Sequence, residues 1–148
     1  MSTAVASPRV SGHDALRAAR QSLDDALTGP SDRAAWGAEV AAALGALHDV
    51  LVRHQRASEA PGGTLEQMVD AKPGLQSKVR ALRLEHPLLI EDARELTSDV
   101  EAAVRAATLD PERVRWKAGA LQDAVRRHVA RGTDLLYEAF HREEGGEG

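Results

Sequence analysis

The sequence contains no cysteine and very few aromatic residues, and both absences narrow the possible functions. Without cysteine there are no disulfide bonds, thiolate metal sites, iron–sulfur clusters or cysteine nucleophiles. Aromatic residues make up only 3% of the 148 residues, so the core has to be built from leucine, valine and alanine. No stretch approaches the ~18 apolar residues that a membrane-spanning helix needs, and the N-terminus has no apolar run typical of a signal peptide. A cytoplasmic protein is therefore expected.

The remaining composition is that of one folded domain. Hydrophobic residues make up 43% of the chain and charged residues 28%, which is typical of soluble globular proteins. The formal net charge is −4, whereas a nucleic-acid-binding protein normally carries a basic surplus. We therefore expect neither a nucleic-acid nor a membrane partner.

Apolar residues recur at helical spacing, and patterns typical of strands are almost absent. Long helices are predicted at about residues 13–28, 32–60, 75–108 and 111–140, and a short helix at 64–70. Short connections rich in glycine and proline separate them. The predicted fold is all-α: an up-down-up-down four-helix bundle over residues 12–142, with a short capping helix between the second and third long helices. Residues 1–11 are expected to form a flexible leader and residues 143–148 a flexible tail.

Three of the six histidines fall on the apolar faces of three different predicted long helices. These are His54, His86 and His128, and one such histidine alone would more often be structural. A helical rise of about 1.5 Å per residue puts His86 and His128 at the same height in the bundle. His13 and His48 match that height as well, and His54 lies about 9 Å from His48 along their helix. A shared layer of imidazoles from His13, His48 or His54, His86 and His128 is therefore predicted.

Neutral imidazole is the commonest metal ligand in proteins, so this layer is a candidate metal site. Carboxylate ligands are harder to assign. Glu59, Glu85 and Asp134 are close in sequence to the three histidines. On an ideal helix each points away from the core, which favours a solvated or ion-paired surface position, although Glu59 would reach inward if it turns where its helix ends. The candidate metal ligands are His54, His86, His128, His48, His13 and Glu59.

Three short segments resemble those of the hemerythrin-like, or HHE cation-binding, family. They are LRLEHPLLIEDAREL at 82–96, LQDAVRRH at 121–128 and HQRASEAPGGTL at 54–65, and GTDLLYEAF at 132–140 is also similar. The resemblance implies a four-helix bundle with a non-haem di-iron site built from histidines and carboxylates of all four helices. This chain has Ser58, Ile90 and Gly132 where the family places further ligands, each four residues after one of the three histidines. A mononuclear site, a different metal and a site without metal are the alternatives.

The resemblance implies a bundle that holds non-haem iron and binds or senses a small oxidant such as dioxygen, peroxide or nitric oxide. No catalytic residue is assigned, and a binding role is favoured over an enzyme. The alternative is a metal-free, degenerate hemerythrin-like bundle that serves as an interaction or small-ligand-binding module. Haem held between two histidines is disfavoured, because aromatic residues are few. Trp36 and Trp116 are expected to cap the core at the end opposite the histidines.

Overall fold

The structure is a computed structural model that describes the backbone of residues 8–141 and the side chains of residues 13–141. This part of the chain is all-helical, which confirms the predicted class. The elements are α1 (Pro8–Thr28), α2 (Trp36–Glu59), α3 (Thr64–Ala71), the 3-10 turn η1 (Pro73–Leu75), α4 (Gln76–Ala106) and α5 (Pro111–Phe140). The predicted tail, and residues 1–7 of the predicted leader, lie outside the described residues, and α1 already begins at Pro8.

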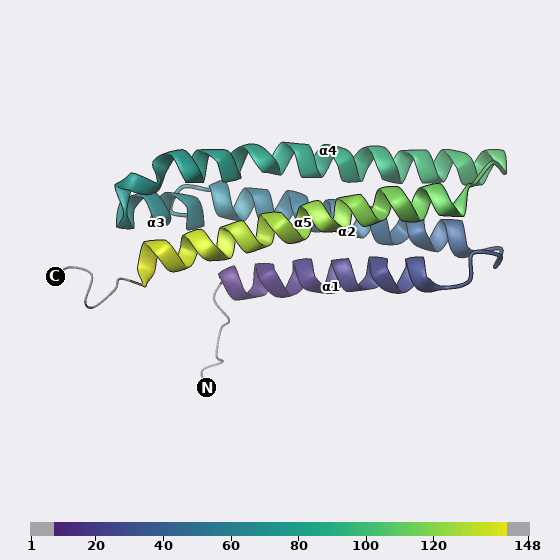
Figure 1. Ribbon diagram of the computed structural model, residues 1–148, viewed down its shortest axis with the longest axis horizontal. Helices are drawn as coiled ribbons and strands as arrows, with labels where there is room; N and C mark the ends of the chain where they lie inside the picture. The colour runs from purple at the N-terminus through teal and green to yellow at the C-terminus, as the bar shows by residue number, and fades with distance from the viewer. Residues whose placement is uncertain (1–7, 142–148) are drawn as a thin grey trace, which may run out of the picture.

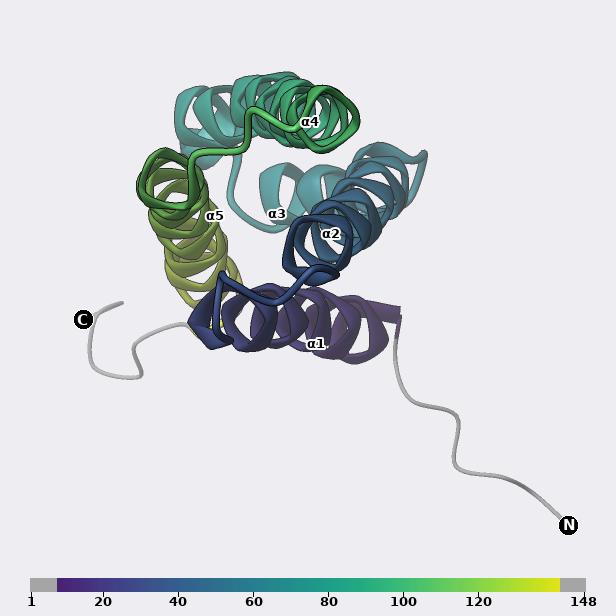
Figure 2. The same ribbon diagram turned by 90° about the vertical axis from the view of Figure 1, so that its right-hand side faces the viewer.

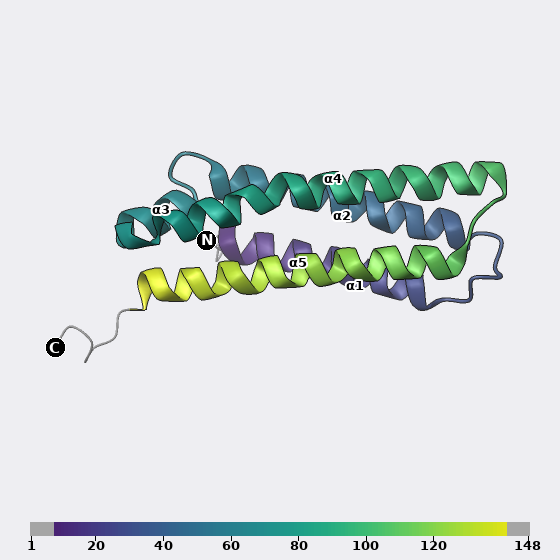
Figure 3. The same cartoon turned by 45° about the horizontal axis from the view of Figure 1, so that its top comes forward.

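The four long helices lie side by side (Figure 1) and surround a common interior when viewed end-on (Figure 2). The connections from α1 to α2 and from α4 to α5 lie at the same end, and the short α3 lies at the opposite end. Figure 3 shows α3 beside the first turns of α4, beyond the end of α2. No helix among the described residues is both long and apolar enough to span a membrane.

Local sequence signals account for the connection between α4 and α5. Ala107 ends α4 in the left-handed conformation, with φ of 58°, and its N–H donates to carbonyls of the last helical turn. Asp110 then caps α5: its side chain accepts a hydrogen bond from the backbone N–H of Arg113. Pro111 occupies the first helical position, where no N–H is needed. The turn therefore fixes where α4 ends and where α5 starts.

Two apolar clusters make up the core. The larger one draws on α1, α2, α4 and α5, and includes the fully buried Trp36 and Leu44. The smaller one joins α3, the start of α4 and the end of α5 around Leu65, Met68 and Leu82. Along α4 and α5 the two clusters are separated by the buried polar residues His86 and His128. The histidines thus form a polar layer between two apolar ones.

The two tryptophans differ in environment. Trp36 is buried, with 0% of its surface exposed, and the guanidinium of Arg115 lies 5.0 Å from the centre of its ring. Trp116 is 75% exposed, so the prediction that both rings cap the core is wrong for this residue. The buried face of α5 at this level is formed by Val114 and Ala118. Trp116 lies two residues from each, which places it on the opposite face of the helix.

Candidate metal centre

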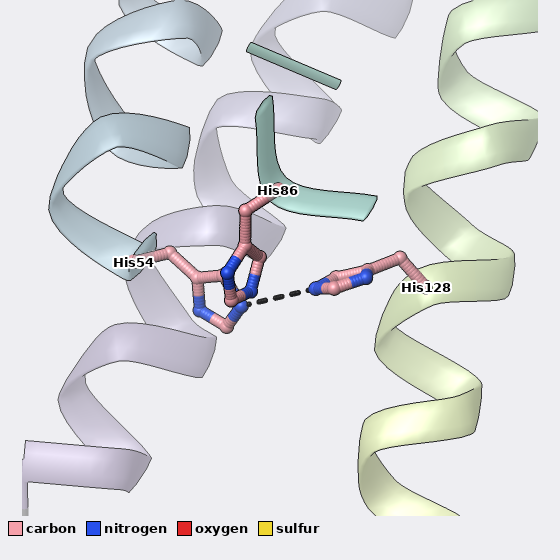
Figure 4. A group of neighbouring side chains, drawn as sticks. All are labelled: His54, His86 and His128. Carbon is pink, nitrogen blue, oxygen red and sulfur yellow. Dashed lines mark hydrogen bonds between the residues drawn. The ribbon is translucent and has the colours of Figure 1, made fainter. Parts of the chain in front are cut away.

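Three helices bring His54, His86 and His128 together in the interior. They belong to α2, α4 and α5, and their ring centres are 4.9–5.4 Å apart. One ring nitrogen of each residue lies within 4.8 Å of the other two, and the rings point toward one another in Figure 4. His86 and His128 are 3% and 2% exposed, and His54 is half-buried. The predicted convergence of these three residues is confirmed.

Two carboxylates hold the outer nitrogens of two of these rings. His86 Nδ1 lies 2.5 Å from Glu59 Oε2, and His128 Nδ1 lies 2.6 Å from Glu85 Oε1. An ionised carboxylate only accepts hydrogen bonds, so the proton in each contact lies on Nδ1, and Nε2 is the ring nitrogen that faces away from the carboxylate. Glu85 is itself bound by Arg131, whose Nη2 lies 2.6 Å from Oε2. Such carboxylate–histidine pairs are typical of the outer shell of metal sites, where they orient the ring and raise its basicity.

Burial keeps the third ring neutral. The pKa of His54 is lowered from 6.5 to about 3, first by burial and then by the nearby His86, His128 and His13. Burial also lowers the pKa of His128, although the hydrogen bond to Glu85 opposes it. Neutral imidazole is the form that binds metal ions, so both residues are in the ligand form at neutral pH.

The separations between the nitrogens suit one metal ion after a small adjustment. Two nitrogens bound at about 2.1 Å in tetrahedral geometry are about 3.4 Å apart. Nε2 of His54 and Nε2 of His128 are 3.3 Å apart. All of the separations are within 4.8 Å, so the widest pair would have to close by at most about 1.4 Å. Three imidazoles without a thiolate suit zinc, iron or copper and leave coordination positions for an exogenous ligand.

The other predicted ligands take different places. His13, on α1, lines a cavity beside the cluster. His48 lies outside the cluster, with Nδ1 3.1 Å from a carboxylate oxygen of its neighbour Asp49. Glu59 does turn inward at the end of α2, and there it contacts His86 at Nδ1. Asp134 is exposed. The structure therefore brings together three of the six predicted ligands and places Glu59 directly behind one of them.

Sequence reasoning did not identify the role of Glu85. An ion-paired surface position was expected, and Glu85 does pair with Arg131, but it also accepts a hydrogen bond from His128. Glu85 directly precedes His86, so it is turned about 100° around α4 and faces α5. Two features identify such a residue in a sequence. It directly adjoins one core histidine, and it faces a neighbouring helix that carries another core histidine.

Comparison with known proteins gives no relative: no family model, no curated protein and no solved structure matches the chain. The support for a metal centre is therefore the convergence of the three imidazoles together with the carboxylates behind two of them.

Proposed function

We propose that this chain binds one transition-metal ion through Nε2 of His54, His86 and His128. The observation that carries the proposal is the arrangement of the three rings. The rings come from three helices. Those of His86 and His128 are hydrogen-bonded at Nδ1 to Glu59 and Glu85, and the lowered pKa of His54 keeps its ring neutral. Isolated buried histidines need no such common orientation.

A single ion is favoured over a dinuclear site by the residues one helical turn further on. Ser58 Oγ donates to the backbone carbonyl of His54 at 2.8 Å, so this hydroxyl is used within its own helix. Ile90 packs against the larger apolar cluster and offers no ligand atom. Gly132 has no side chain. The positions at which the hemerythrin-like family would supply ligands to a second ion are thus filled by residues that do not provide them.

The metal we propose is non-haem iron, and the proposed function is to bind or sense dioxygen, peroxide or nitric oxide. This identity follows the hemerythrin-like resemblance. The up-down-up-down bundle with α3 as its cap, which we also propose, follows from the helical spacing and the short connections. Iron supplies reversible binding of such ligands at positions that the protein leaves open. The chain's own contribution is to bring the three rings together, to orient those of His86 and His128 through Glu59 and Glu85, and to surround the site with apolar side chains.

A metal-free bundle that serves as an interaction or small-ligand-binding module is the second candidate, and one contact favours it. Nε2 of His54 and Nε2 of His128 are 3.3 Å apart, so a proton on His54 Nε2 would make this contact a hydrogen bond without any ion. In that state His54 and His128 satisfy each other, and the cluster has a structural role.

Metal analysis of the chain purified without an affinity tag distinguishes the two candidates. The most informative variant is His54→Leu, because His54 has no carboxylate partner that the change would leave unpaired among the described residues. The matched control is His48→Leu, on the same helix and outside the cluster.

We expect one iron per chain in the wild type and in the control, and loss of iron with retained helix content in His54→Leu. Iron or zinc should also raise the melting temperature of the wild type. Absence of iron binding, with melting unaffected by either metal, would support the metal-free module.

A further inference from the structure

A cavity of about 700 Å³ opens beside the three histidines. It lies between the end of α2, the loop into α3, α3 itself and the inner faces of α4 and α5, with His13 of α1 at its edge. Pockets for small organic molecules have volumes of roughly 300–1,000 Å³. A diatomic ligand would occupy only a small part of this space, so the cavity is large enough for an organic ligand.

The lining is apolar over most of its extent, and its polar side chains are those of the histidines, Arg53, Ser58, Thr64 and Gln67. Six larger apolar side chains form the wall: Val50, Leu65, Met68, Leu82, Val129 and Leu136. The ionisable lining residues are three cluster histidines, His13 and Arg53. Among the described residues, no carboxylate lines the cavity, although the chain has 23 acidic and 19 basic residues. Arg53 is the lining residue with a fixed positive charge, and a metal ion at the histidines would add the charge that attracts an anion to this end of the cavity.

We propose that this cavity binds a medium-chain aliphatic monocarboxylate, with the carboxylate at the histidines and the tail along the apolar wall. The proposal rests on the proposed function, because the metal's open side would face this space. A second charge on the ligand would have to be buried against leucine and methionine side chains at a large cost, which favours a monocarboxylate over a dicarboxylate. A hydrocarbon without a polar head would leave the polar end of the cavity unsatisfied.

A substitution at Gly132 can place a side chain inside the cavity and so test whether a ligand binds there. Gly132 lines the cavity one helical turn beyond His128, and a Cβ built there would lie 3.7 Å from Leu82 Cδ2, which is an ordinary contact. Gly132→Leu therefore adds a side chain where the tail would lie. Gly119→Leu is the matched control: it is on the same helix, outside the cavity, and a Cβ there meets nothing within 4 Å. Both changes raise helix propensity by a similar amount.

The test is calorimetric titration of octanoate and acetate into the Zn²⁺-loaded and the metal-free chain, with Zn²⁺ affinity measured separately for each variant. We expect octanoate to bind the loaded chain at least about a hundredfold more tightly than acetate, because six further methylenes are buried. Gly132→Leu should weaken octanoate binding by about tenfold or more, with Zn²⁺ affinity unchanged, and Gly119→Leu should leave both unchanged. Equal affinity for acetate and octanoate, or an unaffected Gly132→Leu variant, would overturn the proposal.

The metal-free titration separates the two proposals. If no metal binds but octanoate still binds and Gly132→Leu still weakens it, the metal site is refuted and the carboxylate site stands. If Zn²⁺ binds and octanoate does not, the metal site stands and the carboxylate site is refuted.

Discussion

Acidification should destabilise the metal-free chain through His54. The folded-state pKa of His54 is about 3, whereas an unfolded histidine titrates near 6.5. Between these values the unfolded chain takes up a proton that the folded chain does not. The free energy of unfolding therefore falls as the pH decreases from about 6.5 toward 3, and is unaffected by this residue at higher pH.

The size of the effect follows from the difference between the two pKa values. Each pH unit within the window contributes about 1.4 kcal/mol, so His54 alone accounts for about 2 kcal/mol between pH 8 and pH 5. The full difference between the two pKa values, about 3.5, corresponds to about 5 kcal/mol and is reached only below pH 3. His128 adds to the effect, because burial lowers its pKa as well. The stability measurement described below compares pH 8 with pH 5 only, because carboxylates also titrate below pH 5.

Urea denaturation of the metal-free chain at pH 8 and pH 5 measures this difference. His54→Leu should lose about 2 kcal/mol less stability than the wild type over this range, and His48→Leu should lose as much as the wild type. Equal losses in wild type and His54→Leu would refute the interpretation that His54 is buried as a neutral ring.

Further predictions concern the carboxylates, a close contact and a helix cap. Glu59→Gln and Glu85→Gln should each weaken zinc binding by about 10–100-fold in a competition assay with a chelator, because the outer hydrogen bonds orient the ligand rings; unchanged affinity would show that these contacts do not support a metal site. Gly37→Ala should destabilise the chain by about 1–3 kcal/mol in urea denaturation, since its Cβ would lie 2.6 Å from Val104 Cγ2; a neutral effect would contradict the close packing of α2 against α4. Asp110→Ala should cost about 1 kcal/mol through loss of the cap of α5, and an unchanged melting temperature would show that the cap contributes nothing.

The helices and the inward-facing histidines could be predicted from the sequence, because both follow from helical periodicity. His86 and His128 continue the spacing of the buried leucines and valines on their helices, and both are buried. Local periodicity determines which face of a helix is apolar, and burial of that face follows. The class of fold and three of the candidate ligands therefore followed from residue order alone.

The relative heights of the helices could not be predicted in the same way. Counting residues from the helix ends put His48 of α2 level with His86, yet the structure brings His54 to that position. The count assumed that neighbouring helices end together, but α3 packs beside the first turns of α4, beyond the end of α2 (Figure 3). The start of α4 therefore extends past the end of α2, and the level residue on α2 lies nearer its C-terminus. Contacts between helices, which a single sequence does not display, set this offset.

A crystal structure of the chain grown with Fe²⁺, with anomalous data at the iron edge, tests the central claim most directly. The account predicts one anomalous peak within about 2.3 Å of Nε2 of His54, His86 and His128, with Glu59 and Glu85 still on the Nδ1 atoms. A peak elsewhere on the protein, or none between the three rings while His54 and His128 stay in direct contact, would contradict it.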